Sequence, residues 1–176
     1  LYLFNKQQKL KKKLAEQALT DELTGAKNRR AIFEKAKEQF EYAKRYQEPL
    51  TIGVCDLDHF KNLNDTYGHD IGDKVLKAFA KAGNASIRAV DYFGRIGGEE
   101  WLFVFPKTSG EEIARVASRI NSNLAEAALP VSDVPTFSMG TATLSDSDQQ
   151  VKDLFKRADE ALYKAKDSGR NQVVNF

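Results

Sequence analysis

The chain has 176 residues (19.7 kDa), of which 41% are hydrophobic and 30% charged. This balance excludes disorder for the bulk of the chain, because there is enough apolar material to build a core. The formal net charge is +2, but residues 1–30 hold eight Lys or Arg and three Asp or Glu, a charge of +5 that leaves −3 for residues 31–176. The basic excess lies at the start of the chain, so we expect no nucleic-acid-binding face on the globular part and no DNA or RNA partner.

Residues 1–20 are predicted to form a helical leader, because they contain no Gly or Pro and repeat a pattern at alternating spacings of four and three. The residues on this seam are Leu3, Gln7, Leu10, Leu14 and Gln17. The seam indicates a coiled coil sustained for barely two heptads, and a solvated helical linker explains it equally well. Because the chain starts with Leu1 rather than Met, we interpret it as part of a longer protein.

The globular domain is expected over residues 21–176, where segments of helical and strand periodicity follow one another. Helices are predicted over 29–46, 73–89, 111–128 and 151–166, and strands over 51–56, 91–95, 100–105, 136–144 and 172–176. Gly97 and Gly98 make the second and third strands a hairpin, while residues 58–72 are predicted to be polar and irregular. This order predicts an α/β fold with a mixed central sheet covered by helices and an antiparallel hairpin within it.

No transmembrane helix is expected, because the longest wholly apolar run has five residues, Trp101 to Phe105, and about 20 are needed to cross a bilayer. The single cysteine, Cys55, excludes an intrachain disulfide and fits a reducing compartment. We therefore expect the domain in the cytoplasm, on the cytoplasmic side of the membrane if the longer protein is membrane-anchored.

Acidic residues fall where apolar segments end. Asp56 closes a predicted buried strand, Asp58 follows it, and Glu99 and Glu100 come directly after the glycine pair of the hairpin. A partly desolvated charge is costly, so carboxylates are rarely placed there for stability, and Mg²⁺ typically takes one or two carboxylates together with substrate phosphates. The pattern favours a metal site for phosphoryl transfer, and the spacing alone leaves helix capping or bracketing of a turn as an alternative.

Polar residues after the first strand fit a nucleotide. Residues 58–65 are predicted to form a turn into a short helix, whose main-chain N–H groups cradle phosphate, with Lys61 as an added charge. Asn64 and Asp73 offer an amide and a carboxylate, which are groups that bind the edge of guanine. Each residue alone is more often a turn or capping residue, and Asp73 in particular fits an N-cap of the helix after it.

Two further pairs of charged residues have ordinary structural explanations when taken alone. Lys166 and Arg170 flank a turn at the end of the last helix, where cations commonly interact with the helix dipole. Arg88 and Asp91 fit an arginine at a helix end and an aspartate at a strand start. Only in combination with the other motifs do these pairs indicate a function.

Taken together, the motifs resemble the GGDEF family of diguanylate cyclases, which make cyclic di-GMP from two GTP. The matching segments, in the family's order, are Asp21-Glu22-Leu23-Thr24-Gly25 with Asn28-Arg29-Arg30, Asp56-Leu57-Asp58-His59-Phe60-Lys61, Arg95-Ile96-Gly97-Gly98-Glu99-Glu100-Trp101, and Ala161-Leu162-Tyr163-Lys164-Ala165-Lys166 with Gly169-Arg170-Asn171. The resemblance runs from about Thr20 to Phe176 and implies a fold similar to the nucleotidyl cyclase and polymerase palm. It marks the chain as a GGEEW variant, in which Glu99 replaces the commoner aspartate and Trp101 the usual phenylalanine.

The resemblance also implies roles for the matching positions. The metal ligands, for Mg²⁺ or Mn²⁺, are Asp56, the carbonyl of Leu57, and Glu99; the catalytic residues are Asp56, Lys61, Glu99 and Glu100, the last beside the ribose 3′-hydroxyl. The substrate-binding residues are Asn64 and Asp73 for guanine, Phe60, Lys61, Lys166 and Arg170 for the triphosphate, and Gly97 and Gly98 for close approach of the nucleotide. Arg88-Ala89-Val90-Asp91 matches the family's RxxD product-inhibition motif, to which Arg119 contributes.

The expected activity is therefore condensation of two GTP into cyclic di-GMP with release of pyrophosphate, by a homodimer with one GTP per subunit and cyclic di-GMP bound at the inhibitory site. One alternative is a catalytically weak domain that acts as a receptor for GTP or cyclic di-GMP, and the presence of Asp56, Glu99 and Glu100 argues against it. Another alternative joins GTP to ATP, and Asp73 argues against that. The resemblance further implies an upstream sensory domain that is absent from this fragment.

Overall fold

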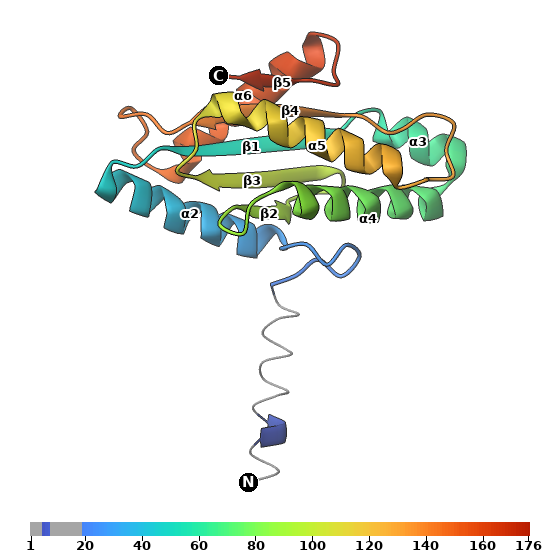
Figure 1. Ribbon diagram of the computed structural model, residues 1–176, viewed down its shortest axis with the longest axis horizontal. Helices are drawn as coiled ribbons and strands as arrows, with labels where there is room; N and C mark the ends of the chain where they lie inside the picture. The colour runs from blue at the N-terminus through green and yellow to red at the C-terminus, as the bar shows by residue number, and fades with distance from the viewer. Residues whose placement is uncertain (1–4, 8–18) are drawn as a thin grey trace.

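The computed structural model describes residues 5–7 and 19–176 (Figure 1). Of the predicted helical leader, residues 5–7 are helical, whereas Leu19 and Thr20 are not, and Thr20 instead forms an isolated β-bridge with Lys27. Apart from Gln7, the coiled-coil seam lies outside the described residues. The boundary between leader and domain therefore stays a prediction. In the described part of the chain, no helix combines the length and the apolar character that crossing a membrane requires.

A five-stranded sheet with the order β2-β3-β1-β4-β5 forms the centre of the domain. The strands are β1 (Leu50–Leu57), β2 (Tyr92–Arg95), β3 (Glu100–Pro106), β4 (Phe137–Thr143) and β5 (Val173–Asn175). β1 is antiparallel to both β3 and β4, β2 and β3 form an antiparallel hairpin, and β5 runs parallel to β4. The predicted mixed sheet and its internal hairpin are confirmed.

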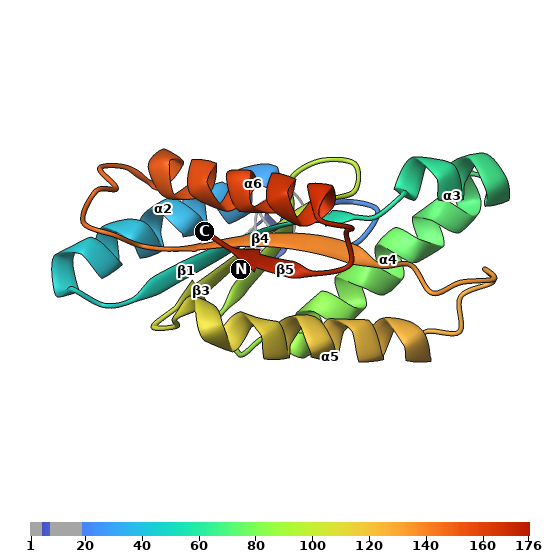
Figure 2. The same ribbon diagram turned by 90° about the horizontal axis from the view of Figure 1, so that it is seen from above.

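Helices cover both faces of this sheet (Figure 2). They are α2 (Arg29–Tyr46), α3 (Phe60–Tyr67), α4 (His69–Ser86), α5 (Ile113–Glu126) and α6 (Val151–Asp167), with a 3₁₀ turn at Gly110–Glu112. α4 and α5 pack on one face and α2 and α6 on the other, so each face has its own hydrophobic core. This double cover explains why β1 is buried along almost its whole length and is a nearly continuous apolar segment.

The prediction of an irregular stretch over residues 58–72 was wrong, because this stretch contains α3 and the start of α4. The short helix expected after the turn in residues 58–65 is present as α3. Its Asn and Asp residues are typical of turns, but Phe60 is buried in the core and fixes the first turn of α3 there. Gly68, with φ of 86°, separates the two helices. α4 thus begins four residues earlier than predicted, and Asp73 lies within it rather than at its N-cap.

Candidate active site

The end of β1 and the start of β3 bring the predicted acidic residues together. Asp56 is paired across the sheet with Glu100, and the N–H of Leu57 donates to the carbonyl of Glu99 at 3.2 Å. The Asp56 side chain is 13% exposed, Glu99 is half-buried and Glu100 is exposed. The prediction that an aspartate at a strand end faces glutamates of a hairpin is confirmed.

This cluster carries more negative charge than its surroundings offset. Burial raises the pKa of Asp56, the Lys166 ammonium at 3.1 Å partly offsets this effect, and the charges of Glu99 and Glu100 add to the rise. In the described part of the chain no three His, Cys, Asp or Glu side chains form a metal-binding group. A cation here would rest on two carboxylates, a main-chain carbonyl and oxygens of the substrate, which is the set that Mg²⁺ commonly takes.

The hairpin turn is held by an arginine that the sequence analysis assigned no role. Arg95 donates from Nε and Nη2 to the Gly98 carbonyl at 2.9 and 2.7 Å, and from Nε to the Gly97 carbonyl at 3.1 Å. Its Nη1 donates to both carboxylate oxygens of Asp21 at 3.1 and 3.3 Å. Burial alone would raise the pKa of Asp21, but hydrogen bonds from Thr24 and Arg95 outweigh it and lower the pKa below its usual value.

The opening loop, residues 20–28, therefore supports the turn that carries Glu99 and Glu100. The N–H of Arg95 donates to the carbonyl of Lys27 at 2.8 Å, which adds a main-chain link to the Asp21 ion pair. The Asp21 motif and the arginine before the glycine pair were both visible in the sequence. Their pairing across 74 residues was not, because no local spacing records it.

The two glycines of the turn differ in what surrounds them. A Cβ on Gly97 would lie 2.6 Å from Oε2 of Glu100, whereas a Cβ on Gly98 would meet no atom within 4 Å. Neither glycine has the left-handed φ that would require one. Gly97 thus gives room to the Glu100 carboxylate, and Gly98 presents bare, exposed backbone.

The α3–α4 pair places the predicted guanine-binding residues at neighbouring positions. Asn64 lies in the last turns of α3 with its Oδ1 against Gly72, the residue before Asp73 on α4. This oxygen is buried and has no hydrogen-bond partner among the described residues. Asp73 is exposed, as is Lys61 on α3, while Phe60 is buried below them.

The carboxylate of Asp58, unlike that of Asp56, is bound by hydrogen bonds from other parts of the chain. Its carboxylate accepts hydrogen bonds from Oγ1 of Thr136 and Oγ of Ser138, both at 2.7 Å, and from the N–H of Asn171 at 3.0 Å. It therefore ties the end of β1 to β4 and to the loop after α6. That loop carries Arg170, one of the predicted triphosphate residues, in a left-handed conformation with φ of 66°.

The predicted product-binding residues surround a hollow of about 170 Å³ at the opposite end of β3 from Glu100. Arg88 forms a two-pronged ion pair with Asp91, with N–O distances of 2.8 and 3.1 Å, and also donates to Oγ1 of Thr108. Arg119 lines the same hollow. The structure adds Arg115, which lies one helical turn before Arg119 on α5 and to which the sequence analysis assigned no role.

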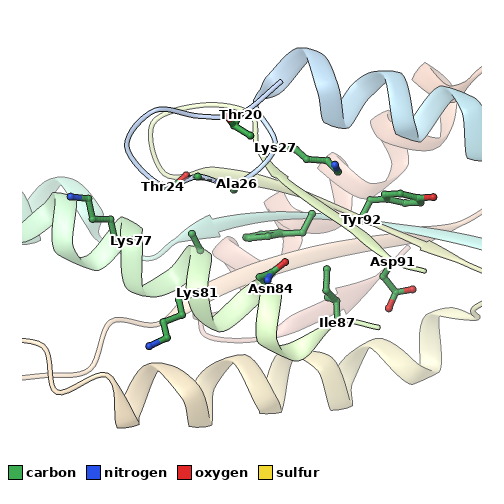
Figure 3. A pocket seen from close by; sticks show the side chains of 13 residues that line it. Thr20, Thr24, Ala26, Lys27, Lys77, Lys81, Asn84, Ile87, Asp91 and Tyr92 are labelled. Carbon is green, nitrogen blue, oxygen red and sulfur yellow. Dashed lines mark hydrogen bonds between the residues drawn. The ribbon is translucent and has the colours of Figure 1, made fainter. Parts of the chain in front are cut away.

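A larger hollow, of about 390 Å³, lies between the opening loop, α4 and the start of β2 (Figure 3). Thr24 of the loop, Asn84 of α4 and Tyr92 of β2 are among its lining residues. None of the clustered carboxylates and none of the predicted phosphate-contacting residues lines it. Volume alone therefore does not mark the candidate active site, which is recognised by the chemistry of its side chains.

Comparison with known proteins gives consistent results. A family model described as "Diguanylate cyclase, GGDEF domain" matches residues 18–172. The response regulator PleD of Caulobacter vibrioides is 38% identical over 164 residues, which cover 90% of this chain and 36% of PleD. A diguanylate cyclase of Vibrio cholerae is 36% identical over 168 residues, covering 95% of this chain and 52% of that protein. The chain thus spans about a third to a half of the length of these relatives.

Solved structures match as well. The coiled coil and GGDEF domain of DgcB from Caulobacter crescentus, in complex with c-di-GMP, superposes with a TM-score of 0.91 at 25% identity and covers 99% of this chain and 94% of that one. The active GGEEF domain of a diguanylate cyclase from Vibrio cholerae gives a TM-score of 0.79 at 35% identity, over 85% of this chain and 96% of that one. The sheet order and helix cover described above are therefore those of a known fold.

Proposed function

The chain belongs to the GGDEF family, and from that premise we propose that it is a diguanylate cyclase that condenses two GTP into cyclic di-GMP and releases two pyrophosphates. The observation that carries the proposal is the cluster of Asp56, Glu99 and Glu100, where burial and like charges raise the pKa of Asp56. A fold rarely accumulates such charge for stability. A metal-bound triphosphate would neutralise it.

In this proposal the carboxylates of Asp56 and Glu99, with the carbonyl of Leu57, hold Mg²⁺ or Mn²⁺. The metal would neutralise charge on the triphosphate and polarise its α-phosphate. The donor set fits, since all its atoms are hard oxygens and the cluster has one neighbouring cation, Lys166. Glu100, which is exposed beside this pair, would accept the proton of a ribose 3′-hydroxyl.

The remaining substrate contacts come from three elements. Lys61 and the main chain at Phe60, together with Lys166 and Arg170, would bind the triphosphate. Asn64 and Asp73 would bind guanine, with Gly97 and Gly98 leaving the nucleotide close access to the turn. Phosphoryl transfer depends mainly on positioning and charge stabilisation, and these residues supply both.

One such domain holds one GTP, so the reaction requires two copies. The 3′-oxygen of one nucleotide attacks the α-phosphorus of the other, and each attack breaks the bond to one pyrophosphate. A symmetric homodimer would bring the two half-sites face to face. We place product inhibition at the hollow of Arg88, Asp91 and Arg119, where guanidinium groups would bind phosphate and a carboxylate would bind guanine.

The test is GTP turnover with Mg²⁺ over a range of protein concentrations. Cyclic di-GMP and pyrophosphate should appear, the specific activity should rise with protein concentration, and Glu99→Gln should remove the product. If the folded, dimeric protein binds GTP or cyclic di-GMP in calorimetry without making product, the receptor alternative replaces the proposal. Product analysis from a mixture of GTP and ATP tests the mixed-nucleotide alternative.

A further inference from the structure

Gly72 is in contact with the residue to which we assign guanine binding, and the contact leaves no room for a side chain. An ideal Cβ on Gly72 would lie 1.8 Å from Oδ1 of Asn64, 3.0 Å from its Cγ and 3.3 Å from Cζ of Phe60. The backbone does not require glycine here, because its φ lies outside the left-handed region. What excludes a larger residue is the space that the Asn64 carboxamide takes up.

A glycine inside a helix is otherwise unfavourable, since alanine is the better helix former. Gly72 is the fourth residue of α4, which runs on to Ser86, and it is buried. A purely structural position of this kind would favour alanine. The preference for glycine at position 72 is therefore explained by contacts outside the helix. The nearest such group is the Asn64 carboxamide.

The second observation concerns Asn64 itself. Its Oδ1 is buried and has no hydrogen-bond partner among the described residues, although buried polar atoms are nearly always paired. The nitrogen of the same carboxamide is not among the buried unpaired atoms. Since the carboxamide is planar, seating one edge against Gly72 directs the other edge toward accessible space.

The same contact joins α3 to α4, because Asn64 and Phe60 of α3 both lie next to Gly72 of α4. Phe60, at the start of α3, is only 8% exposed and belongs to the core beneath the helices. A methyl group at position 72 is therefore blocked by the core on the Phe60 side, and the group that can yield is the Asn64 side chain. Asp73, the other proposed guanine-binding residue, is the next residue along α4.

We propose that Gly72 is a specificity-determining positioning residue, whose missing side chain seats the Asn64 carboxamide in the orientation that binds the edge of guanine. The inference rests on the proposed function, because it takes guanine as the base that Asn64 contacts. Gly72 itself touches no substrate in this proposal. It acts through the side chain that it accommodates.

The experiment compares Gly72→Ala with the wild type in the full chain, using GTP, ITP and ATP as substrates and as ligands in calorimetry. The accessible group of the carboxamide is its N–H₂, a donor, so ATP, in which an amino group replaces the O6 acceptor of guanine, reports on this contact, and ITP, which keeps O6, serves as a reference. We expect Gly72→Ala to raise the KM for GTP by at least about tenfold, the effect of one lost hydrogen bond, with a smaller change in kcat. The preference for GTP over ATP in binding should fall, GTP and ITP should weaken together, and thermal stability should be retained because alanine favours the helix.

Two further variants separate positioning from damage to the helix. In an Asn64→Ala background, Gly72→Ala should cause no further loss of GTP affinity, since the carboxamide that it would displace is already gone. The double variant also removes the clash between the new Cβ and Asn64, so it can be studied if Gly72→Ala alone folds poorly. Gly83→Ala is the matched control on α4. Its Cβ would meet the Phe93 ring at 2.7 Å, so it should alter stability and leave the GTP-to-ATP affinity ratio unchanged.

The outcomes distinguish this inference from the proposed function. If the wild type makes no cyclic product from GTP, the proposed function fails. If the wild type makes cyclic di-GMP and Gly72→Ala keeps the GTP-to-ATP affinity ratio, or loses as much in the Asn64→Ala background as alone, the role of Gly72 is overturned while the cyclase activity stands.

Discussion

Aspartates at the two ends of the β1–β4 pair are held in opposite ways. Where β1 ends, Asp56 is mostly buried beside two glutamates and one lysine, and its pKa is raised, first by burial. At the far end, Asp148 follows β4 and accepts hydrogen bonds from Arg157 and Ser145. Burial alone would raise the pKa of Asp148, but these bonds outweigh it and the pKa is lowered.

The charges of Asp148 and Asp56 therefore have opposite effects on the stability of the folded state. The pairing of Asp148 favours the folded state, because the ionised carboxylate is better bound there than in water. Burial of Asp56 among like charges opposes folding, and such local unfavourable arrangements concentrate at functional sites. We expect changes at the Asp56 end to affect turnover, and changes at the Asp148 end to affect stability.

The largest effect is expected from Asp56→Asn. It removes a proposed metal ligand, so cyclic di-GMP synthesis from GTP should fall at least about a hundredfold. The free energy of unfolding should stay the same or rise, because a partly buried charge among like charges is gone. Turnover assays and thermal melts measure both, with the exposed Glu111→Gln as a control that should change neither. A large loss of stability in Asp56→Asn would contradict the distinction between the two ends.

The second change, Asp58→Asn, tests whether a hydrogen-bonded carboxylate at the Asp56 end stabilises the fold as Asp148 does at the other end. An amide cannot accept all three hydrogen bonds from Thr136, Ser138 and Asn171, so the free energy of unfolding should fall by about 2–3 kcal/mol. The KM for GTP should rise, since the loop that carries Arg170 loses its anchor. Ser138→Ala, which removes one donor, should cost only about 1 kcal/mol. Unchanged stability in Asp58→Asn would show that the network is dispensable.

A smaller effect, confined to stability, is expected from Asp148→Asn. Urea unfolding at pH 7 should show a loss of about 1–2 kcal/mol, and turnover at saturating GTP should match the wild type. Because the folded pKa of Asp148 is lowered from its usual 3.8, its contribution is complete above that value and is lost as the pH falls through the folded pKa. The two proteins should therefore converge in acid below about pH 4, and a constant difference down to pH 2 would contradict this assignment.

The smallest effect is expected from Trp101→Phe, in β3 close to the Gly97–Gly98 turn. Trp101 is fully buried between Phe79 and Phe93, with ring centroids 5.1 Å from each, and its indole N–H has no partner among the described residues. Removing an unpaired donor offsets the loss of ring volume, so the net change should stay below about 1 kcal/mol. A loss of 3 kcal/mol or more would show that the larger ring is needed for packing.

Much of the fold could be predicted because apolar residues repeat at the period of each element. The helix over 29–46 has the predicted bounds, and Gly97 and Gly98 correctly indicated the hairpin. The error over 58–72 arose where polar composition favours turns, while burial of Phe60 and packing against α4 favour helix. Tertiary contacts decided that segment, and local sequence does not show them.

In the candidate site, too, contacts set by local sequence could be predicted and contacts between distant segments could not. The approach of Asp56 to Glu99 and Glu100 followed from a strand end and a hairpin turn. The ion pair of Asp56 with Lys166 was not predictable, nor was the bond from Asn171 to Asp58, because the partners lie more than 100 residues apart and only the completed sheet brings them together.

The Asp21–Arg95 ion pair has a consequence for where the smallest working unit begins. A shortened chain that starts at Asn28 would keep every strand of the sheet and all the helices from α2 onward. It would lose Asp21 and the Lys27 carbonyl, two of the groups that hold Arg95 and, through it, the Gly97 and Gly98 carbonyls. Such a chain would keep both cores and lose part of the support of the turn beside Asp56. If the proposed function holds, the shortest active chain is therefore longer than the shortest chain that folds.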